Sequence, residues 1–234
     1  MGDFGQAAAT AIQMILGADP RLWSVVLLSL NVSLAATALA ALIGLPLGAL
    51  IALRDFPGHH LVTVILNACM GLPTVVVGIA VYLLLSRAGP LGPLGLLFTP
   101  GAMIVAQTLL VLPIVAAVSR QIIADAWSEY REQLTSLGAG PVQAAATLIH
   151  DCRFSLTTAI LAGFGRAAAE VGAVLVVGGN IDGVTRVMTT SIALETSKGD
   201  LPQALGLGFV LMTIVIAING VAQLLRAAAA RQGA

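Results

Sequence analysis

Residues 129–154 read EYREQLTSLGAGPVQAAATLIHDCRF, and this polar stretch lies between long apolar segments of the chain. A short helical run at its start is expected to stop at Leu137, because Gly138 supplies the backbone freedom that a helix C-terminus needs. Pro141 then suits the first turn of a second helix, which we expect over Val142–Ile149. The stretch therefore predicts a compact helix–turn–helix.

The second of these helices has an apolar face. Ala144, Ala145 and Leu148 fall on one side of it at helical spacing. We expect that face to pack against the rest of the protein.

The composition indicates an integral membrane protein. Hydrophobic residues make up 58% of the 234 residues and charged residues only 9%, whereas a soluble domain carries about a quarter charged residues. The formal net charge is zero, so no nucleic-acid partner is expected. Cys69 lies in an apolar run and Cys152 in the polar stretch, so we expect no disulfide between them.

Five apolar segments are long enough to cross a membrane as helices. They cover about residues 23–53, 61–85, 101–118, 155–177 and 202–225, with a polar loop at 119–154. The fold class is thus all-α, with about five transmembrane helices in a single domain of residues 23–234. Residues 1–22 contain a shorter apolar patch, which predicts an interfacial helix and leaves a further span as the alternative.

Several spans contain residues that interrupt or tighten helices. Gly71 and Pro73 fall near the middle of the second span, and lipid tolerates the resulting break only where protein or water covers it. Gly44 and Gly48 flank a proline in the first span, which permits close helix contact and a kink. Asp200 is a suitable N-cap for the last span.

The positive charges indicate the orientation. Six arginines fall on the side of the helix–turn–helix and four cations on the other: Arg54, Arg120, Arg131, Arg153, Arg226 and Arg231, against Arg21, Arg87, Arg186 and Lys198. This bias places the helix–turn–helix and the C-terminus in the cytoplasm and the N-terminus outside.

The fourth span carries two opposite charges. Arg166 and Glu170 are four residues apart, so on one helix they would share a face. Charges at mid-membrane are costly and usually face a bundle interior or a pathway. Two compatible interpretations follow: an ion pair that holds helices together, and a group that lines or gates an anion path. The glycines of this span, Gly163, Gly165 and Gly172, are interpreted as close-contact positions.

No residue set predicts catalysis or metal binding. The sequence has no Gly-x-x-x-x-Gly-Lys-Ser/Thr phosphate loop, so any ATP would be bound by another chain. Hydroxyl groups of the second outer loop could face a substrate, or could cap and solvate the backbone: Thr185, Thr189, Thr190 and Ser191.

The helix–turn–helix resembles the EAA loop of the permease subunits of ATP-binding-cassette (ABC) importers. Glu132 occupies the glutamate position of that motif and Gly138 the glycine position six residues later. The sequence departs from the motif at Gln133-Leu134, where the family has Ala-Ala, and at His150-Asp151, where it has Leu-Pro.

A second segment extends the resemblance. Residues 164–173 read FGRAAAEVGA and residues 177–181 read VGGNI, which is similar to the oxyanion branch of these permeases, whose members carry sulfate, molybdate or tungstate. With TSIALETSKGD at 190–200, the form is most similar to the tungstate type.

The resemblance implies the type I permease fold in a bacterial inner membrane and import of tungstate or molybdate by alternating access. It implies a homodimer within membrane lipid, two ATPase subunits that bind ATP and Mg²⁺ on the cytoplasmic side, and a periplasmic oxyanion-binding protein. The residues it assigns to ATPase coupling are Glu132, Leu134, Leu137, Gly138 and Ala139, and those assigned to the path or gate are Arg166, Glu170 and Gly172.

Other classes of function remain alternatives. Sulfate or another anion could be the cargo of the same kind of permease. An ion-driven secondary transporter would require inverted repeats and intramembrane carboxylates, but the spans contain no clear repeat and one carboxylate, beside Arg166. An intramembrane enzyme would require paired catalytic groups within the spans.

Overall fold

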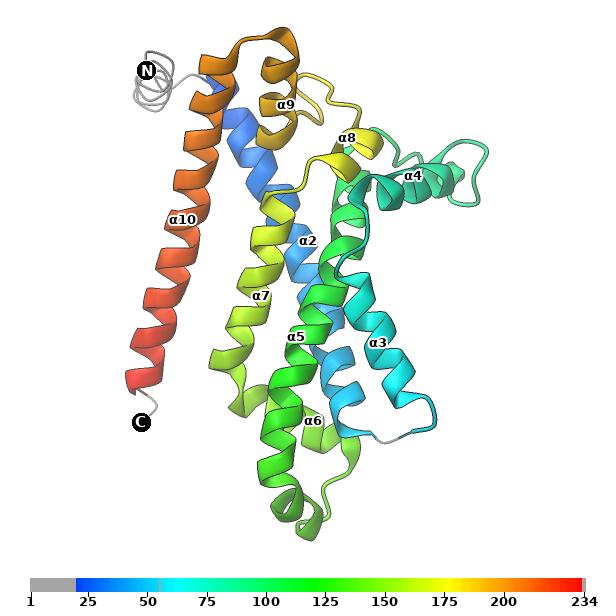
Figure 1. Cartoon of the computed structure of the whole chain (residues 1–234), viewed down its shortest axis with the longest axis vertical. Helices are drawn as coiled ribbons and strands as arrows, with labels where there is room; N and C mark the ends of the chain where they lie inside the picture. The colour runs from blue at the N-terminus through cyan, green and yellow to red at the C-terminus, as the bar shows by residue number, and fades with distance from the viewer. Residues whose placement is uncertain (1–19, 55, 233–234) are drawn as a thin grey trace. The chain divides into compact units, whose positions relative to one another are not determined.

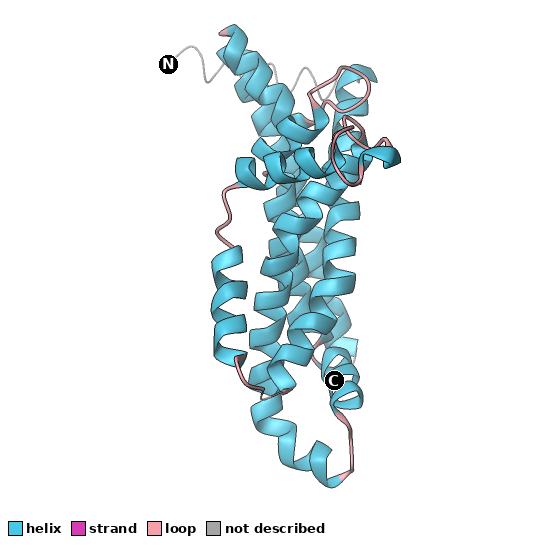
Figure 2. Cartoon of the chain, turned by 90° about the vertical axis from the view of Figure 1, so that its right-hand side faces the viewer, coloured by secondary structure: helices cyan, strands magenta, loops and turns pink. Residues whose placement is uncertain are grey.

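The computed structural model describes residues 20–54 and 56–232, and every regular element within these ranges is helical (Figures 1 and 2). The elements in chain order are α2 (Pro20–Leu53), α3 (His59–Cys69), α4 (Thr74–Leu85), the 3₁₀ helix η1 (Gly92–Leu94), α5 (Pro100–Ser136), α6 (Pro141–Asp151), α7 (Arg153–Ala168), α8 (Gly172–Gly178), α9 (Met188–Lys198) and α10 (Leu201–Gln232). Residues 1–19, the larger part of the expected interfacial segment 1–22, lie outside the described ranges.

Three of these helices are long and apolar enough to cross a membrane, namely α2, α5 and α10 up to Arg226. Two further pairs, α3 with α4 and α7 with α8, are also apolar enough, but each is interrupted by four residues or fewer. The described chain therefore has three candidate spans, or five if each interrupted pair crosses once. The expected all-α membrane fold is confirmed.

The interruption in the second span was expected from its sequence. Helix α3 ends at Cys69 and α4 begins at Thr74, so the break contains Gly71 and Pro73. Proline has no N–H to donate and its ring clashes with the preceding turn, which is why the helix stops there.

Two other boundaries differ from the sequence expectation. The polar loop expected at 119–154 begins as helix, because α5 continues without a break to Ser136. No glycine or proline interrupts residues 119–136, and Gln121 donates a side-chain hydrogen bond to Asp125 one turn later (3.0 Å). The fourth span, expected as one helix over 155–177, is split between α7 and α8.

The helices group into two compact units, whose boundaries fall inside α2, α5 and α10, between α3 and α4, and at the last residue of α7. Among the described residues, the first unit contains 20–35, 74–107 and 168–225, and the second contains 36–54, 56–73, 108–167 and 226–232.

In the first unit, the start of α2 packs against α9 and α10. Leu22 and Val26 of α2 are buried with Met188 of α9 and with Leu207 and Val210 of α10. Ser29 Oγ also accepts a hydrogen bond from the Met188 N–H (2.7 Å), which fixes the start of α9. In the same unit α4 packs on α8 so closely that a Cβ at Gly78 would lie 2.8 Å from the Ala173 Cα.

In the second unit, glycines let α2 and α5 approach. A Cβ at Gly44 would lie 3.2 Å from the Val115 side chain, and Ser119 Oγ donates to the Gly44 carbonyl oxygen (3.3 Å). On α7, a Cβ at Gly163 would lie 2.8 Å from Val111. Lipid gives apolar side chains little reason to cluster, so close backbone contact of this kind is what holds membrane helices together. The close-contact interpretation is confirmed for Gly44 and Gly163, but it is wrong for Gly165, where a Cβ would meet nothing within 4 Å.

Candidate functional site

The α5–α6 turn (residues 137–140) has the geometry that its sequence predicts. Gly138 adopts a left-handed conformation with φ +73°, and the Ala139 N–H donates to the Leu134 carbonyl oxygen (3.0 Å). This pattern closes a helix end with a glycine just beyond it. The left-handed region disfavours side chains with a Cβ, so the turn depends on glycine at position 138.

Helix α6 begins directly after this turn. Gly140 precedes Pro141 in an extended conformation, and the Gln143 side chain accepts a hydrogen bond from the Gly140 N–H (3.1 Å). A glutamine three residues after the cap thus satisfies a backbone donor at the helix start. Backbone groups on both sides of the turn are therefore hydrogen-bonded.

One face of α6 is buried, as expected, at Ala144, Ala145 and Leu148. Ala145 and Leu148 belong to a cluster with Ile123 of α5 and Leu156 of α7. Leu134, one of the predicted coupling residues, also packs against this cluster. Leu134 therefore joins the end of α5 to α6 rather than facing outward.

The opposite side of the turn exposes apolar side chains. Leu137 is 82% exposed and Val142 is 67% exposed, and Glu132 is also exposed. Ala139 is half-buried beside them. Val142 was not among the predicted site residues, although its position on the face of α6 opposite Ala144 and Leu148 could have revealed it.

The end of α6 is compact in spite of the His150-Asp151 sequence. The helix ends at Asp151, and α7 begins two residues later at Arg153. Arg153 Nη1 donates to the His150 carbonyl oxygen (2.8 Å), so a cation satisfies the negative end of the helix. The departure from the family motif thus leaves a closed helix end.

A pocket of about 590 Å³ lies where α5 meets the junction of α6 and α7. Three carboxylates line it, those of Asp125, Glu129 and Asp151, together with Cys152. Burial, and secondarily the charge of Asp151, raise the pKa of the Cys152 thiol. No group of three His, Cys, Asp or Glu side chains is arranged to hold a metal ion in the described ranges.

The predicted gate residues lie at the break between α7 and α8. Arg166 is in the last turn of α7, which ends at Ala168, whereas Glu170 lies beyond that end. The expectation that one helix face carries both is wrong. The ion pair between them stays a prediction.

Helix α7 does not continue through Glu170, because the carboxylate and the carbonyl group of Glu170 bond to other elements. Glu170 is 2% exposed, its Oε1 accepts from the Ala173 N–H (2.9 Å), and its carbonyl oxygen accepts from Thr189 Oγ1 (2.8 Å). The carboxylate caps the start of α8, where a negative charge is favourable. Gly172 follows in close contact with α4, since a Cβ there would lie 2.8 Å from Thr74 Oγ1.

The hydroxyl groups of the outer loop are buried and serve the backbone. Thr185 Oγ1 donates to the Gly178 carbonyl oxygen (2.6 Å) and accepts from the Ile181 N–H (2.9 Å). Thr190 Oγ1 donates to the Val187 carbonyl oxygen (3.0 Å). With Thr189 bonded to Glu170, these three hydroxyls act as caps, and the substrate-facing interpretation of them is wrong.

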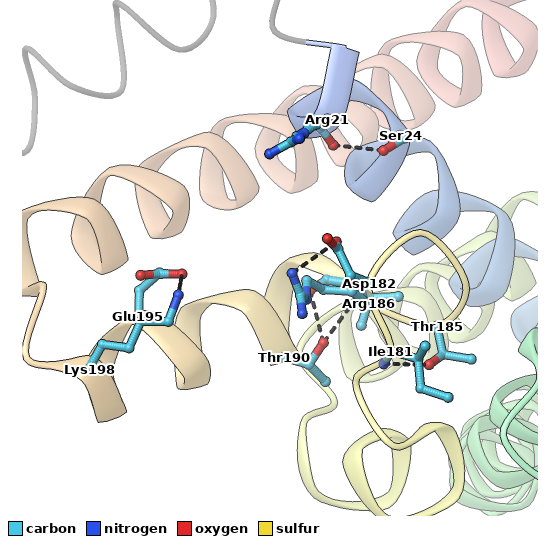
Figure 3. Close-up of polar contacts among 10 residues, drawn as sticks. Arg21, Ser24, Ile181, Asp182, Thr185, Arg186, Thr190, Glu195 and Lys198 are labelled. Atoms are coloured by element: carbon cyan, nitrogen blue, oxygen red, sulfur yellow. Dashed lines mark hydrogen bonds and ion pairs between the residues drawn. The ribbon is translucent and has the colours of Figure 1, made fainter.

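Charged residues of the same loop form ion pairs with near neighbours in sequence. Figure 3 shows Arg186 joined to Asp182 and Lys198 joined to Glu195, at 2.9 Å and 2.7 Å. Asp200, the expected N-cap of α10, accepts from the Gln203 N–H (3.1 Å). That prediction is confirmed.

The described chain thus combines apolar helices that can cross a membrane with an exposed helix–turn–helix. The sequence matches the family described as "Binding-protein-dependent transport system inner membrane component" over residues 44–231, and the chain belongs to that family. It is a multi-pass inner-membrane permease subunit of an ABC importer, a transport subunit rather than an enzyme, and such an importer works with a binding protein and an ATPase.

The relatives of the chain include several anion permeases. It is 42% identical to a tungstate uptake system permease protein of Peptoclostridium acidaminophilum, over 90% of this chain and 92% of the relative. It is also 42% identical to a "probable anion ABC transporter permease protein" of Haloferax volcanii, over 84% and 87% of the two chains. A sulfate transport system permease protein of Synechococcus elongatus is 26% identical, over 80% and 70%.

Proposed function

We propose that this chain is the permease subunit of a tungstate importer. The observation that carries the proposal is the 42% identity to a tungstate uptake permease along almost the whole of both chains. A second tungstate uptake permease, from Campylobacter jejuni, is 38% identical over 70% of this chain. The sulfate permease is more distant, at 26%.

Molybdate is the second candidate cargo. Tungstate and molybdate are tetrahedral dianions of nearly equal size, so a shared path would carry both. We infer that the choice between them is made by the periplasmic binding protein, where desolvated donors contact the anion directly.

The proposed assembly is a homodimer of this chain with two ATPase subunits. ATP and Mg²⁺ bind to the ATPase subunits, since this sequence has no phosphate loop. The N-terminus lies outside and the C-terminus in the cytoplasm, which the six-to-four distribution of cations favours. In that orientation the α5–α6 turn faces the cytoplasm, where the ATPase binds.

The α5–α6 turn is the proposed coupling element. Leu137 and Val142 are the exposed apolar groups that an ATPase surface would bury, and Glu132 and Ala139 lie beside them. Leu134 and the buried face of α6 join this surface to α5 and α7. A movement of the ATPase would therefore shift these helices as one body.

The proposed gate is the break at Glu170. The capping contact of the carboxylate with Ala173, the bond from Thr189 to the Glu170 carbonyl oxygen and the contact of Gly172 with α4 join α8, α9 and α4 around Glu170. Packed contacts of this kind switch between discrete arrangements rather than deforming continuously. Arg166, in the last turn of α7, would exchange partners in such a switch.

Elemental mass spectrometry of cells with and without this chain tests the proposed function. Cells that lack the chain are expected to lose tungsten accumulation from medium supplied with tungstate, molybdate and sulfate, and to keep molybdenum and sulfur. Loss of molybdenum alone, or of sulfur alone, would instead identify molybdate or sulfate as the transported anion. Unchanged levels of all three, with expression of the chain verified by immunoblot, would contradict oxyanion import.

A further inference from the structure

The segment that follows α4 folds back on the end of that helix. The Leu91 N–H donates to the Leu84 carbonyl oxygen (3.0 Å). Ser86 makes two further bonds: its N–H donates to the Tyr82 carbonyl oxygen (2.8 Å), and its Oγ donates to the Leu83 carbonyl oxygen (3.0 Å). The carbonyl groups of Tyr82, Leu83 and Leu84, near the end of α4, are therefore satisfied by the segment itself. Arg87, next to them, is not needed as a helix cap.

This fold-back encloses a pocket of about 570 Å³, which we call the Tyr82–Arg87 pocket. Its lining residues all come from residues 82–98: Tyr82, Leu85, Ser86, Arg87, Gly92, Gly95, Leu97 and Phe98. Within the described part of the chain, neither the Arg87 guanidinium nor the Tyr82 hydroxyl has a hydrogen-bond or ion-pair partner. The pocket therefore offers a cation and a neutral donor to an anionic group.

The aromatic wall of the pocket is held in an unusual conformation. Phe98 has φ +60°, which a bulky side chain rarely adopts. Its N–H donates to the Val177 carbonyl oxygen (3.0 Å), and its ring meets Tyr82 edge-on at 6.1 Å. A Cβ at Gly179 would lie 2.9 Å from this ring. Backbone conformations of this kind occur preferentially at ligand sites.

The segment that lines the pocket also carries exposed apolar side chains. Leu83 and Leu94 are each 61% exposed, and Leu91 is 44% exposed. In a protein of this class such leucines contact acyl chains, while tyrosine and arginine beside them suit the headgroup layer. The volume of the pocket is also far larger than a four-oxygen anion requires. Both features favour a lipid over a free oxyanion.

We propose that the Tyr82–Arg87 pocket binds the phosphate group of a phospholipid in the outer leaflet. Arg87 provides paired donors to the phosphate oxygens, the Tyr82 hydroxyl donates a further bond, and the exposed leucines of the same segment contact the acyl chains. The proposal goes beyond the transport function and depends on the proposed topology only for the choice of leaflet.

Native mass spectrometry of the purified permease–ATPase complex tests the proposal, with phosphatidylglycerol, diacylglycerol and tungstate as separate probes. Losing a charge-assisted hydrogen bond in Arg87→Ala should reduce retention of phosphatidylglycerol roughly tenfold. Arg87→Lys and Tyr82→Phe, which disturb the fold least, should reduce it by smaller factors. Lys198→Ala is the matched control, because that outer cation is already paired with Glu195.

Diacylglycerol has no phosphate, so its retention should be equal in all of these proteins. Equal retention of phosphatidylglycerol by the wild type and Arg87→Ala would overturn the proposal. So would an equal loss in Lys198→Ala, or tungstate binding that needs Arg87 while lipid retention does not. Lipid retention is measured without transport, so failure of the tungstate assignment would leave this result unaffected.

Discussion

Gly48 provides a test of helix contact at the scale of one methyl group. A Cβ there would overlap Ser119 Oγ and lie 2.5 Å from the Ala116 carbonyl oxygen. Gly48→Ala should therefore destabilise the protein by about 1–3 kcal/mol, the usual cost of overpacking, and lower its thermal unfolding midpoint in detergent. Gly165→Ala is the control, because a Cβ at Gly165 meets nothing within 4 Å. Equal midpoints for the two variants would contradict the close contact.

Cys152 provides a pH-dependent signal next to the α5–α6 turn. Its pKa is raised first by burial and then by the charge of Asp151, so the reactive thiolate should appear only at higher pH than for a free cysteine. In a Cys69→Ala background, the pH midpoint of alkylation by iodoacetamide should lie above that of a free thiol. Asp151→Asn removes a negative charge and should lower this midpoint. A midpoint that rises in Asp151→Asn would contradict the assignment.

At the scale of elements, the α5–α6 turn contains two glycines that differ in backbone conformation. Gly138 has φ +73°, whereas Gly140 has φ −71°, and neither position has a neighbour that a Cβ would meet within 4 Å. Gly138→Ala should cost about 1 kcal/mol in the left-handed conformation and reduce transport-coupled ATP hydrolysis in the assembled complex. The Gly140→Ala variant should retain transport-coupled ATP hydrolysis. Equal hydrolysis by both variants would show that the left-handed turn is not required.

The exposed side of the same element should bind the ATPase. Leu137→Ser and Val142→Ser should each reduce co-purification of the ATPase subunit while leaving the thermal midpoint of the permease unchanged, because both side chains are already exposed. Leu148→Ala is the contrasting variant, since truncating a buried leucine should cost about 2–5 kcal/mol. Full ATPase recovery with both serine variants would place the docking surface elsewhere.

The sequence was informative about these elements where local chemistry decides the structure. The turn at Gly138, the buried face of α6, the break at Gly71 and Pro73 and the cap at Asp200 were all predicted, because each depends on residues close together in the chain. The break after Ala168 was not. Residues 166–170 read RAAAE, which favours a helix, and the chain leaves the helix because Thr189, nineteen residues away, bonds to Glu170.

The distinction between local sequence signals and contacts distant in the chain also applies to the candidate site. Leu137 and Gly138 are exposed in the α5–α6 turn and Glu132 is exposed near the end of α5, while their role in coupling stays a prediction. Leu134 is turned toward α6, and Val142 takes a place on the exposed face. The sequence left the outer-loop hydroxyls open between a capping and a substrate-facing role, because their backbone partners come from loop geometry that alternation and composition do not encode. Motifs locate such a site, whereas tertiary contacts decide which of its side chains are exposed.

At the scale of the whole molecule, the orientation in the membrane can be tested with two single cysteines. Thr135 and Ser197 are both exposed, on the cytoplasmic and outer sides of the proposed topology. In a background with Cys69 and Cys152 replaced by alanine, a membrane-impermeant maleimide should label Ser197→Cys in intact spheroplasts. Thr135→Cys should be labelled only after the membrane is permeabilised. The reverse result would invert the topology, and the α5–α6 turn would then face away from the compartment that holds ATP.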